Sequence, residues 1–129
     1  MLAVFIARYF AISLLVVALS HAAQPRLWRD FFIAVKRTGY AGIIIPMFTF
    51  PLGLLLVLGH NVWVWDVPVI ITLCGWGMTI KSLSYALLPG RADRMIPEGA
   101  NAHRLYAVGG YFGIAASALL LYHYYFRVH

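Results

Sequence analysis

Three charged residues lie inside long apolar stretches of the sequence: Arg8, Asp66 and Lys81. A charge within hydrocarbon is costly, so such residues usually pair, line a polar path, or reach the boundary with water. Asp66 and Lys81 are fifteen residues apart, about 22 Å along one helix, and cannot touch. Arg8 and Asp66 fall at similar depths below the same surface. We therefore expect either an ion pair between them or independent contact with water.

Small and polar residues recur around Lys81 at intervals of three and four, as Cys74, Gly77, Lys81 and Ser84. On a helix this spacing forms one stripe. We expect the stripe to face other helices, where Lys81 would find partners. The alternative is a lysine that lies about 10 Å from the membrane boundary and reaches it with its flexible stem.

The histidines raise the question of haem or metal. His60 and His123 fall near one boundary, and His21 and His103 near the other. Two histidines on facing helices could hold a haem iron. None of these four lies well within an apolar run, however, so we expect neither a cofactor nor a metal site.

Combinations of side chains that could catalyse a reaction are equally sparse. The single cysteine, Cys74, excludes an intramolecular disulfide and a cysteine-based zinc site. The sequence has no nucleophile–base pair, paired carboxylates, phosphate-binding loop or HExxH motif. We therefore do not expect an enzyme.

The elements that must carry these residues follow from composition. Hydrophobic residues make up 63% of the 129 residues and charged residues 11%, against about 45–50% and 25% in soluble domains. One small core could not bury so much apolar surface. Four segments are long enough to cross a bilayer as helices: residues 2–22, 39–59, 62–88 and 105–126. We predict an all-α fold: one domain, residues 1–129, forming an integral membrane four-helix bundle.

The first segment has a rival interpretation as a secretory signal, because "ALSHAAQP" resembles a small-residue cleavage site. No charge precedes Arg8, so the basic leading region of a signal is poor. We expect the segment to be retained as a helix.

The connections differ in charge. Residues 24–37, "QPRLWRDFFIAVKR", combine an apolar face with Arg26, Arg29, Lys36 and Arg37. They predict a short interfacial amphipathic helix, with anionic lipid as a possible partner of its basic residues. Residues 89–103 are rich in Pro and Gly and indicate a surface loop.

The distribution of basic residues predicts the topology. The first and third connections are arginine-rich, whereas the second, "HNVW", has no Lys or Arg. Positive loops stay in the cytoplasm, so both termini should lie outside it. The net charge of +6 thus reflects membrane topology, and we expect no nucleic-acid partner.

Proline and small residues suggest how the helices pack. Pro46 and Pro51 fall inside the second segment and Pro68 inside the third, where each removes a backbone donor. Kinked packing and an ion site of a transporter both use such breaks. In the fourth segment the helix-packing candidates Gly109, Gly113 and Ser117 form a ridge for close contact, within the chain or with another copy.

Residues 60–89 carry a resemblance. A His-Asn-x-Trp element precedes a Thr-x-x-Gly-Trp-x-x-Thr-x-Lys element, and the residues are His60, Asn61, Trp63, Thr72, Gly75, Trp76, Thr79 and Lys81. The pattern resembles that of a group of short, uncharacterised bacterial four-span membrane proteins, many of which have Gly where this chain has Ser82. The resemblance implies a four-helix architecture and a bacterial inner (plasma) membrane. It brings no known activity.

Together these features favour a small membrane interaction protein, acting as a homo-oligomer or an accessory subunit of a larger membrane complex. An oligomeric small-solute or ion transporter, with a polar path near Asp66 and Lys81, is the alternative. A haem-binding electron-transfer subunit comes third.

Overall fold

The fold is all-α. A computed structural model describes residues 2–88, 90–99 and 101–127, and those residues contain helices but no strand. The elements in order are α1 (Leu2–Ala23), α2 (Pro25–Arg37), α3 (Ala41–Gly59), α4 (Val69–Leu87), α5 (Arg91–Met95), α6 (His103–Tyr122) and the π-helical turn η1 (His123–Arg127). The predicted all-α four-helix bundle is therefore confirmed.

Four helices of the described chain are long and apolar enough to cross a membrane. They are α1, α3, α4, and α6 continued by η1. Their length and composition are those of a multi-pass membrane protein.

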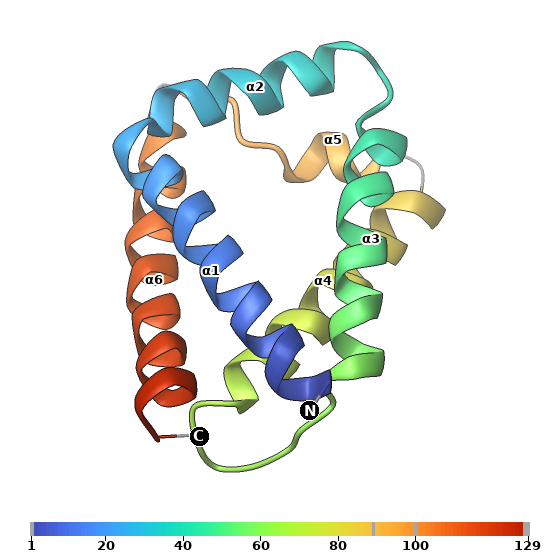
Figure 1. Ribbon diagram of the computed structural model, residues 1–129. Helices are drawn as coiled ribbons and strands as arrows, with labels where there is room; N and C mark the ends of the chain where they lie inside the picture. The colour runs from blue at the N-terminus through green and yellow to red at the C-terminus, as the bar shows by residue number, and fades with distance from the viewer. Residues whose placement is uncertain (1, 89, 100, 128–129) are drawn as a thin grey trace.

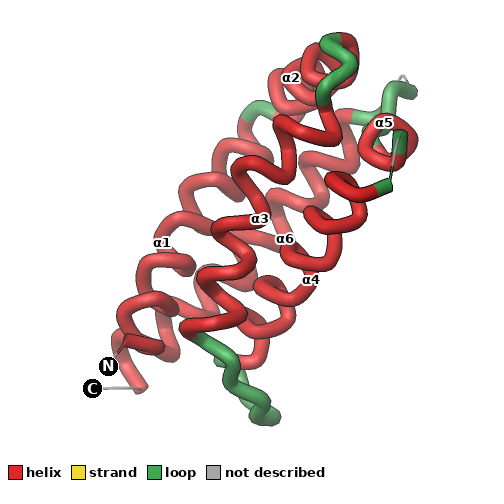
Figure 2. The backbone as a smooth tube through the Cα atoms, turned by 90° about the vertical axis from the view of Figure 1, so that its right-hand side faces the viewer, coloured by secondary structure: helices red, strands yellow, loops and turns green. Residues whose placement is uncertain are grey.

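The bundle consists of two helix pairs, α1 with α6 and α3 with α4 (Figure 1). We call the end that α2 crosses the α2 end, and the opposite end, with residues 60–68 and both termini, the terminal end. Figure 2 shows α2 and α5 together at the α2 end and the connection between α3 and α4 at the terminal end. The pairs diverge from the terminal end toward the α2 end (Figure 1).

Two apolar clusters hold this arrangement. The larger joins all four long helices at the terminal end; its buried members are Ile6, Ala7, Phe10, Ala11, Leu56, Ile71, Leu120 and Tyr124. The smaller, at the α2 end, joins α2 to α3, α4 and the α5 region through Val35, Ala41, Tyr85, Ala92 and Ile96. The bundle is thus closed at one end by its long helices and at the other by α2.

Small residues allow close approach within the α1–α6 pair, but not all those predicted. Ser117 is fully buried, and a Cβ added at Gly113 would lie 2.8 Å from that of Ala18. A Cβ at Gly109 would meet nothing within 4 Å, whereas one at Gly110 would lie 2.6 Å from the Ala22 nitrogen. Gly110 therefore makes the close contact with α1, and the predicted ridge residue Gly109 lies on an open face of α6.

The third spanning helix begins later than predicted, at Val69 rather than Val62. Pro68 directly precedes α4 instead of lying inside it, and the Asp66 carboxylate accepts the Val67 N–H at 2.8 Å. Proline and aspartate both favour the start of a helix over its interior. Residues 60–68 are consequently a connection, and Asp66 lies outside the helix.

The remaining predicted boundaries are close. Residues 25–37 form the helix α2, and Pro46 and Pro51 lie within an unbroken α3. Residues 89–103 are not simply a surface loop, because they contain α5, whose Ala92 is 2% exposed. Apolar residues within this Pro- and Gly-rich stretch pack α5 against α3 and α4.

Candidate functional site

A polar network at the terminal end ties the connection of residues 60–68 to α4 and η1. The His60 ring, 1% exposed, has its Nε2 at 2.9 Å from the Tyr124 hydroxyl. The buried Thr72 hydroxyl lies 2.8 Å from the Val62 carbonyl and 3.1 Å from that of His60, and it accepts the Val62 N–H at 3.1 Å. One side chain on α4 thus lies within hydrogen-bond distance of three backbone groups of the connection, accepting from one and donating its single O–H to a carbonyl.

Asn61 extends this network on the exposed side. Its Oδ1 accepts the indole N–H of Trp63 at 2.8 Å and that of Trp76 at 3.3 Å. The structure therefore brings together His60, Asn61, Trp63, Thr72 and Trp76, which the sequence pattern singled out. Their bonds hold a backbone connection in place.

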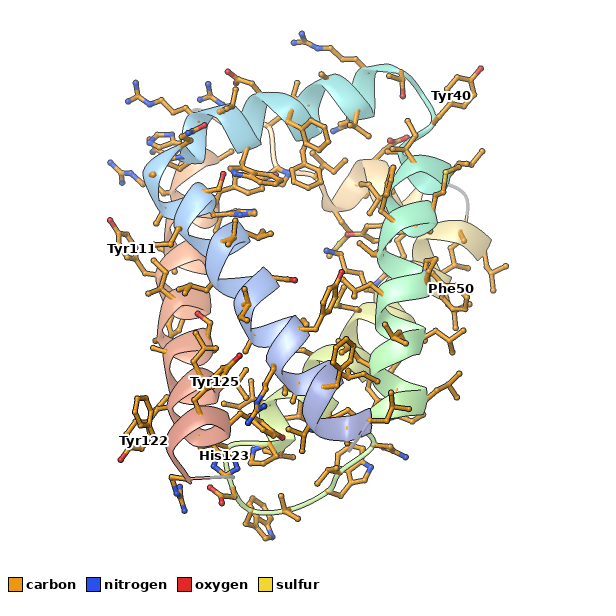
Figure 3. All side chains as sticks on the ribbon, viewed as in Figure 1. Tyr40, Phe50, Tyr111, Tyr122, His123 and Tyr125 are labelled. Atoms are coloured by element: carbon orange, nitrogen blue, oxygen red, sulfur yellow. The ribbon has the colours of Figure 1, made fainter. Side chains whose placement is uncertain are left out.

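Arg8 and Asp66, for which an ion pair was one of two alternatives, do not pair with each other within the described residues. Arg8 donates to the Tyr124 carbonyl at 2.8 Å and lies 4.6 Å from the centroid of the Tyr125 ring. Figure 3 shows Tyr125 between α6 and α1. Carbonyls at a helix C-terminus lack helical partners and carry partial negative charge, so they compete well for a guanidinium.

Asp66 pairs instead with Arg127. An Arg127 guanidinium nitrogen lies 3.8 Å from an Asp66 oxygen, and both side chains are substantially exposed. Such a pair contributes little stability. Asp66 is therefore an exposed carboxylate on the connection between α3 and α4. From this position it does not line a polar path along α4 together with Lys81.

Burial lowers the pKa of His60, because the ring loses water that would stabilise its charged form. The neutral ring has one donor and one acceptor nitrogen, which suits its contact with the Tyr124 hydroxyl. Among the described residues, His123 is buried at the terminal end, and His21 stacks on Trp28 with ring centroids 4.0 Å apart. Across residues 2–88, 90–99 and 101–127, no three His, Cys, Asp or Glu side chains form a group that could hold a metal ion.

Lys81 faces a cavity of about 630 Å³. The cavity lies between the helix pairs, toward the α2 end; its walls are mainly aromatic and aliphatic and include Phe31, Phe32, Ile45, Phe48, Tyr85 and Tyr106. The Lys81 nitrogen lies 5.5 Å from the centroid of the Tyr85 ring. None of the ion pairs within the described residues includes Lys81.

The stripe predicted around Lys81 is not the one that packs on α3. The buried small and polar residues of α4 are Thr72, Gly75, Thr79 and Ser82. A Cβ at Gly75 would lie 2.7 Å from that of Leu56, and the Ser82 hydroxyl is 2.6 Å from that of Thr49. Ser82 therefore joins α4 to α3 by a hydrogen bond that glycine could not make.

The basic residues of α2 divide into two kinds. Arg29 pairs with Asp30 at 2.8 Å, and Lys36 pairs with Glu98 at 3.2 Å. Arg26 and Arg37 make no ion pair within the part of the chain that the structure describes. Anionic lipid at α2 stays a prediction, for which these two arginines are the better placed.

No protein-family model, curated protein or solved structure matches this chain. The resemblance to bacterial four-span membrane proteins therefore stays a prediction.

Proposed function

We propose that this chain is a small, non-enzymatic interaction protein of a bacterial inner membrane, which works as a homo-oligomer or as an accessory subunit. The observation that carries the proposal is the use of its polar side chains as internal ties. His60 bonds Tyr124, Thr72 bonds the connection before α4, and Thr49 bonds Ser82. Groups that hold a scaffold together are not free to act on a substrate.

The proposed topology has both termini outside the cytoplasm. Arg26, Arg29, Lys36 and Arg37 lie on α2, and Arg91, Arg94 and Arg104 lie on α5 and at the start of α6. All seven therefore belong to the α2 end, and basic residues favour the cytoplasmic side. In this topology α2 rests on the inner surface of the membrane.

The transporter alternative has less support, because Asp66 lies on an exposed connection and pairs with Arg127. The haem alternative would require His60 to give up the Tyr124 hydroxyl. Neither alternative uses the contacts that the chain makes.

The test is purification from native membranes in a mild detergent, followed by mass spectrometry of the proteins that accompany the chain. We expect a fixed stoichiometry, either with further copies or with a larger protein. Gly109→Leu tests whether the open face of α6 contacts another copy. It places a large side chain on that face, where nothing of the same chain lies within 4 Å of an added Cβ. A chain that purifies alone as a monomer under all mild conditions would contradict the proposal.

A further inference from the structure

The cavity at Lys81 has the size of a binding site for a small molecule. It measures about 630 Å³, within the roughly 300–1,000 Å³ typical of ligand pockets. It exists because the helix pairs diverge toward the α2 end, away from the apolar cluster that joins them (Figure 1).

The α2 side of this cavity is firmly built. Trp28 donates its indole N–H to the Ser20 hydroxyl at 2.8 Å, and the Phe32 ring stacks on Tyr106 with centroids 5.6 Å apart. At the other end of α2, Val35 is buried and Lys36 pairs with Glu98. Because α2 is held at both ends, these contacts position one wall of the cavity.

The walls select for a molecule with two parts. Phe48, Ile45 and Phe31 offer an apolar surface suited to an acyl chain, and Lys81 offers one positive charge. An ammonium within an apolar region is stabilised by a negative partner, and the described ion pairs give Lys81 none. The cavity thus complements an anionic head attached to a hydrocarbon tail.

Position and local charge indicate where such a molecule comes from. Lys81 lies six residues before Leu87, the last residue of α4, hence about 9 Å from the end of that helix. Its stem can bridge much of this distance toward the boundary where lipid phosphates lie. The basic residues of the α2 end would attract anionic lipid to the same boundary.

We propose that the cavity binds one anionic phospholipid of the surrounding membrane, with its phosphate at the Lys81 ammonium and an acyl chain along the aromatic walls. This site is distinct from the exposed basic face of α2. It stands independently of the proposed protein partner, because all the residues that line the cavity belong to one chain.

The test uses the full chain, purified in mild detergent and exposed to equal amounts of phosphatidylglycerol and phosphatidylcholine, with native mass spectrometry counting the lipids retained. We expect one retained phosphatidylglycerol per chain. Lys81→Met should lower its retention about tenfold, as loss of a charged hydrogen bond implies. Lys81→Arg should keep it, and so should the control Arg127→Met, which removes an exposed cation at the terminal end, away from the cavity.

A second variant covers the case in which Lys81→Met fails to fold. Ile45→Trp fills the cavity without changing any charge and should displace the lipid. Equal retention of both lipids by the wild-type chain, or retention of phosphatidylglycerol unchanged by Lys81→Met, would overturn the proposal. Retention of a free fatty acid in place of the phospholipid would also overturn the proposal. So would a cross-link from Lys81 to a helix of another protein, because each result identifies a different occupant.

Discussion

A single methyl group at Gly110 tests whether α1 and α6 pack at backbone contact. The added Cβ would lie 2.6 Å from the Ala22 nitrogen and 2.9 Å from the Ala18 carbonyl oxygen. Ordinary contacts to a Cβ begin at about 3.4 Å, and backbone atoms cannot rotate away. The two helices must therefore separate by several tenths of an ångström in Gly110→Ala.

Gly109 provides a matched control, because it is the preceding residue of the same helix and its added Cβ meets nothing within 4 Å. Both substitutions share the intrinsic gain of replacing glycine in a helix, up to about 1 kcal/mol. Overpacking costs about 1–3 kcal/mol. The difference in unfolding free energy between the variants should therefore be about 1–3 kcal/mol, with Gly110→Ala the less stable.

The assay is unfolding of both variants in the same mild detergent, followed by circular dichroism during heating or titration with a denaturing detergent. Gly110→Ala should unfold earlier than the wild type, and Gly109→Ala should unfold at the same point or later. Equal stability of the two variants would refute the close α1–α6 contact. Destabilisation by Gly109→Ala alone would show that the tight contact lies on the face of α6 that carries Gly109, and not at Gly110.

Three further predictions concern the polar network at the terminal end. Thr72→Val should lower the unfolding free energy by about 1–3 kcal/mol because it leaves buried backbone groups unpaired. Thr79→Val removes a bond only to its own helix, so it should lower the unfolding free energy less in the same denaturation assay. Tyr124→Phe should cost about 0.5–1.5 kcal/mol while keeping the backbone carbonyl that pairs with α1; an unchanged stability would contradict the bond to His60. Because burial lowers the pKa of His60, the unfolded chain binds a proton more readily, so stability should be full above about pH 6.5 and fall as the pH drops toward the lower folded pKa. His60→Gln should remove this part of the pH dependence.

Hydropathy predicted the long helices well because crossing a membrane constrains the length and composition of a helix. The amphipathic pattern of residues 24–37 predicted α2 because a helix with one apolar face leaves that pattern in the sequence. The start of α4 was missed because Trp63 and Trp65 are apolar in composition yet lie in a connection. Pro68 and Asp66 favour a helix start after the connection, and the bond from the Thr72 hydroxyl to the Val62 carbonyl holds the connection against α4. Such bonds join residues brought together by the fold, and periodicity contains no trace of them.

The glycine ridge shows a limit of a different kind. Gly109 and Gly110 are adjacent, and both stand at helical spacing from Gly113 and Ser117. Small residues at intervals of three and of four lie on one face, so either glycine completes a ridge. The choice depends on where the backbone of α1 passes, and that position is a property of the partner helix.

Lys81 explains why α4 packs with one small-residue stripe and not the other. Turning Cys74, Gly77 and Lys81 toward α3 would bury an ammonium against a helix with no acidic residue, and an unpaired buried charge is costly. The stripe of Thr79 and Ser82 avoids this cost, since both hydroxyls bond carbonyls of their own helix. Electrostatics thus selects the packing face of α4, and the same selection leaves Lys81 directed at the space between the helix pairs. The position of Lys81 at the cavity is therefore a consequence of this choice. The close approach at Gly75 and the Thr49–Ser82 hydrogen bond hold α4 on α3 without the ammonium, so a variant that removes the charge should leave the α3–α4 contact intact.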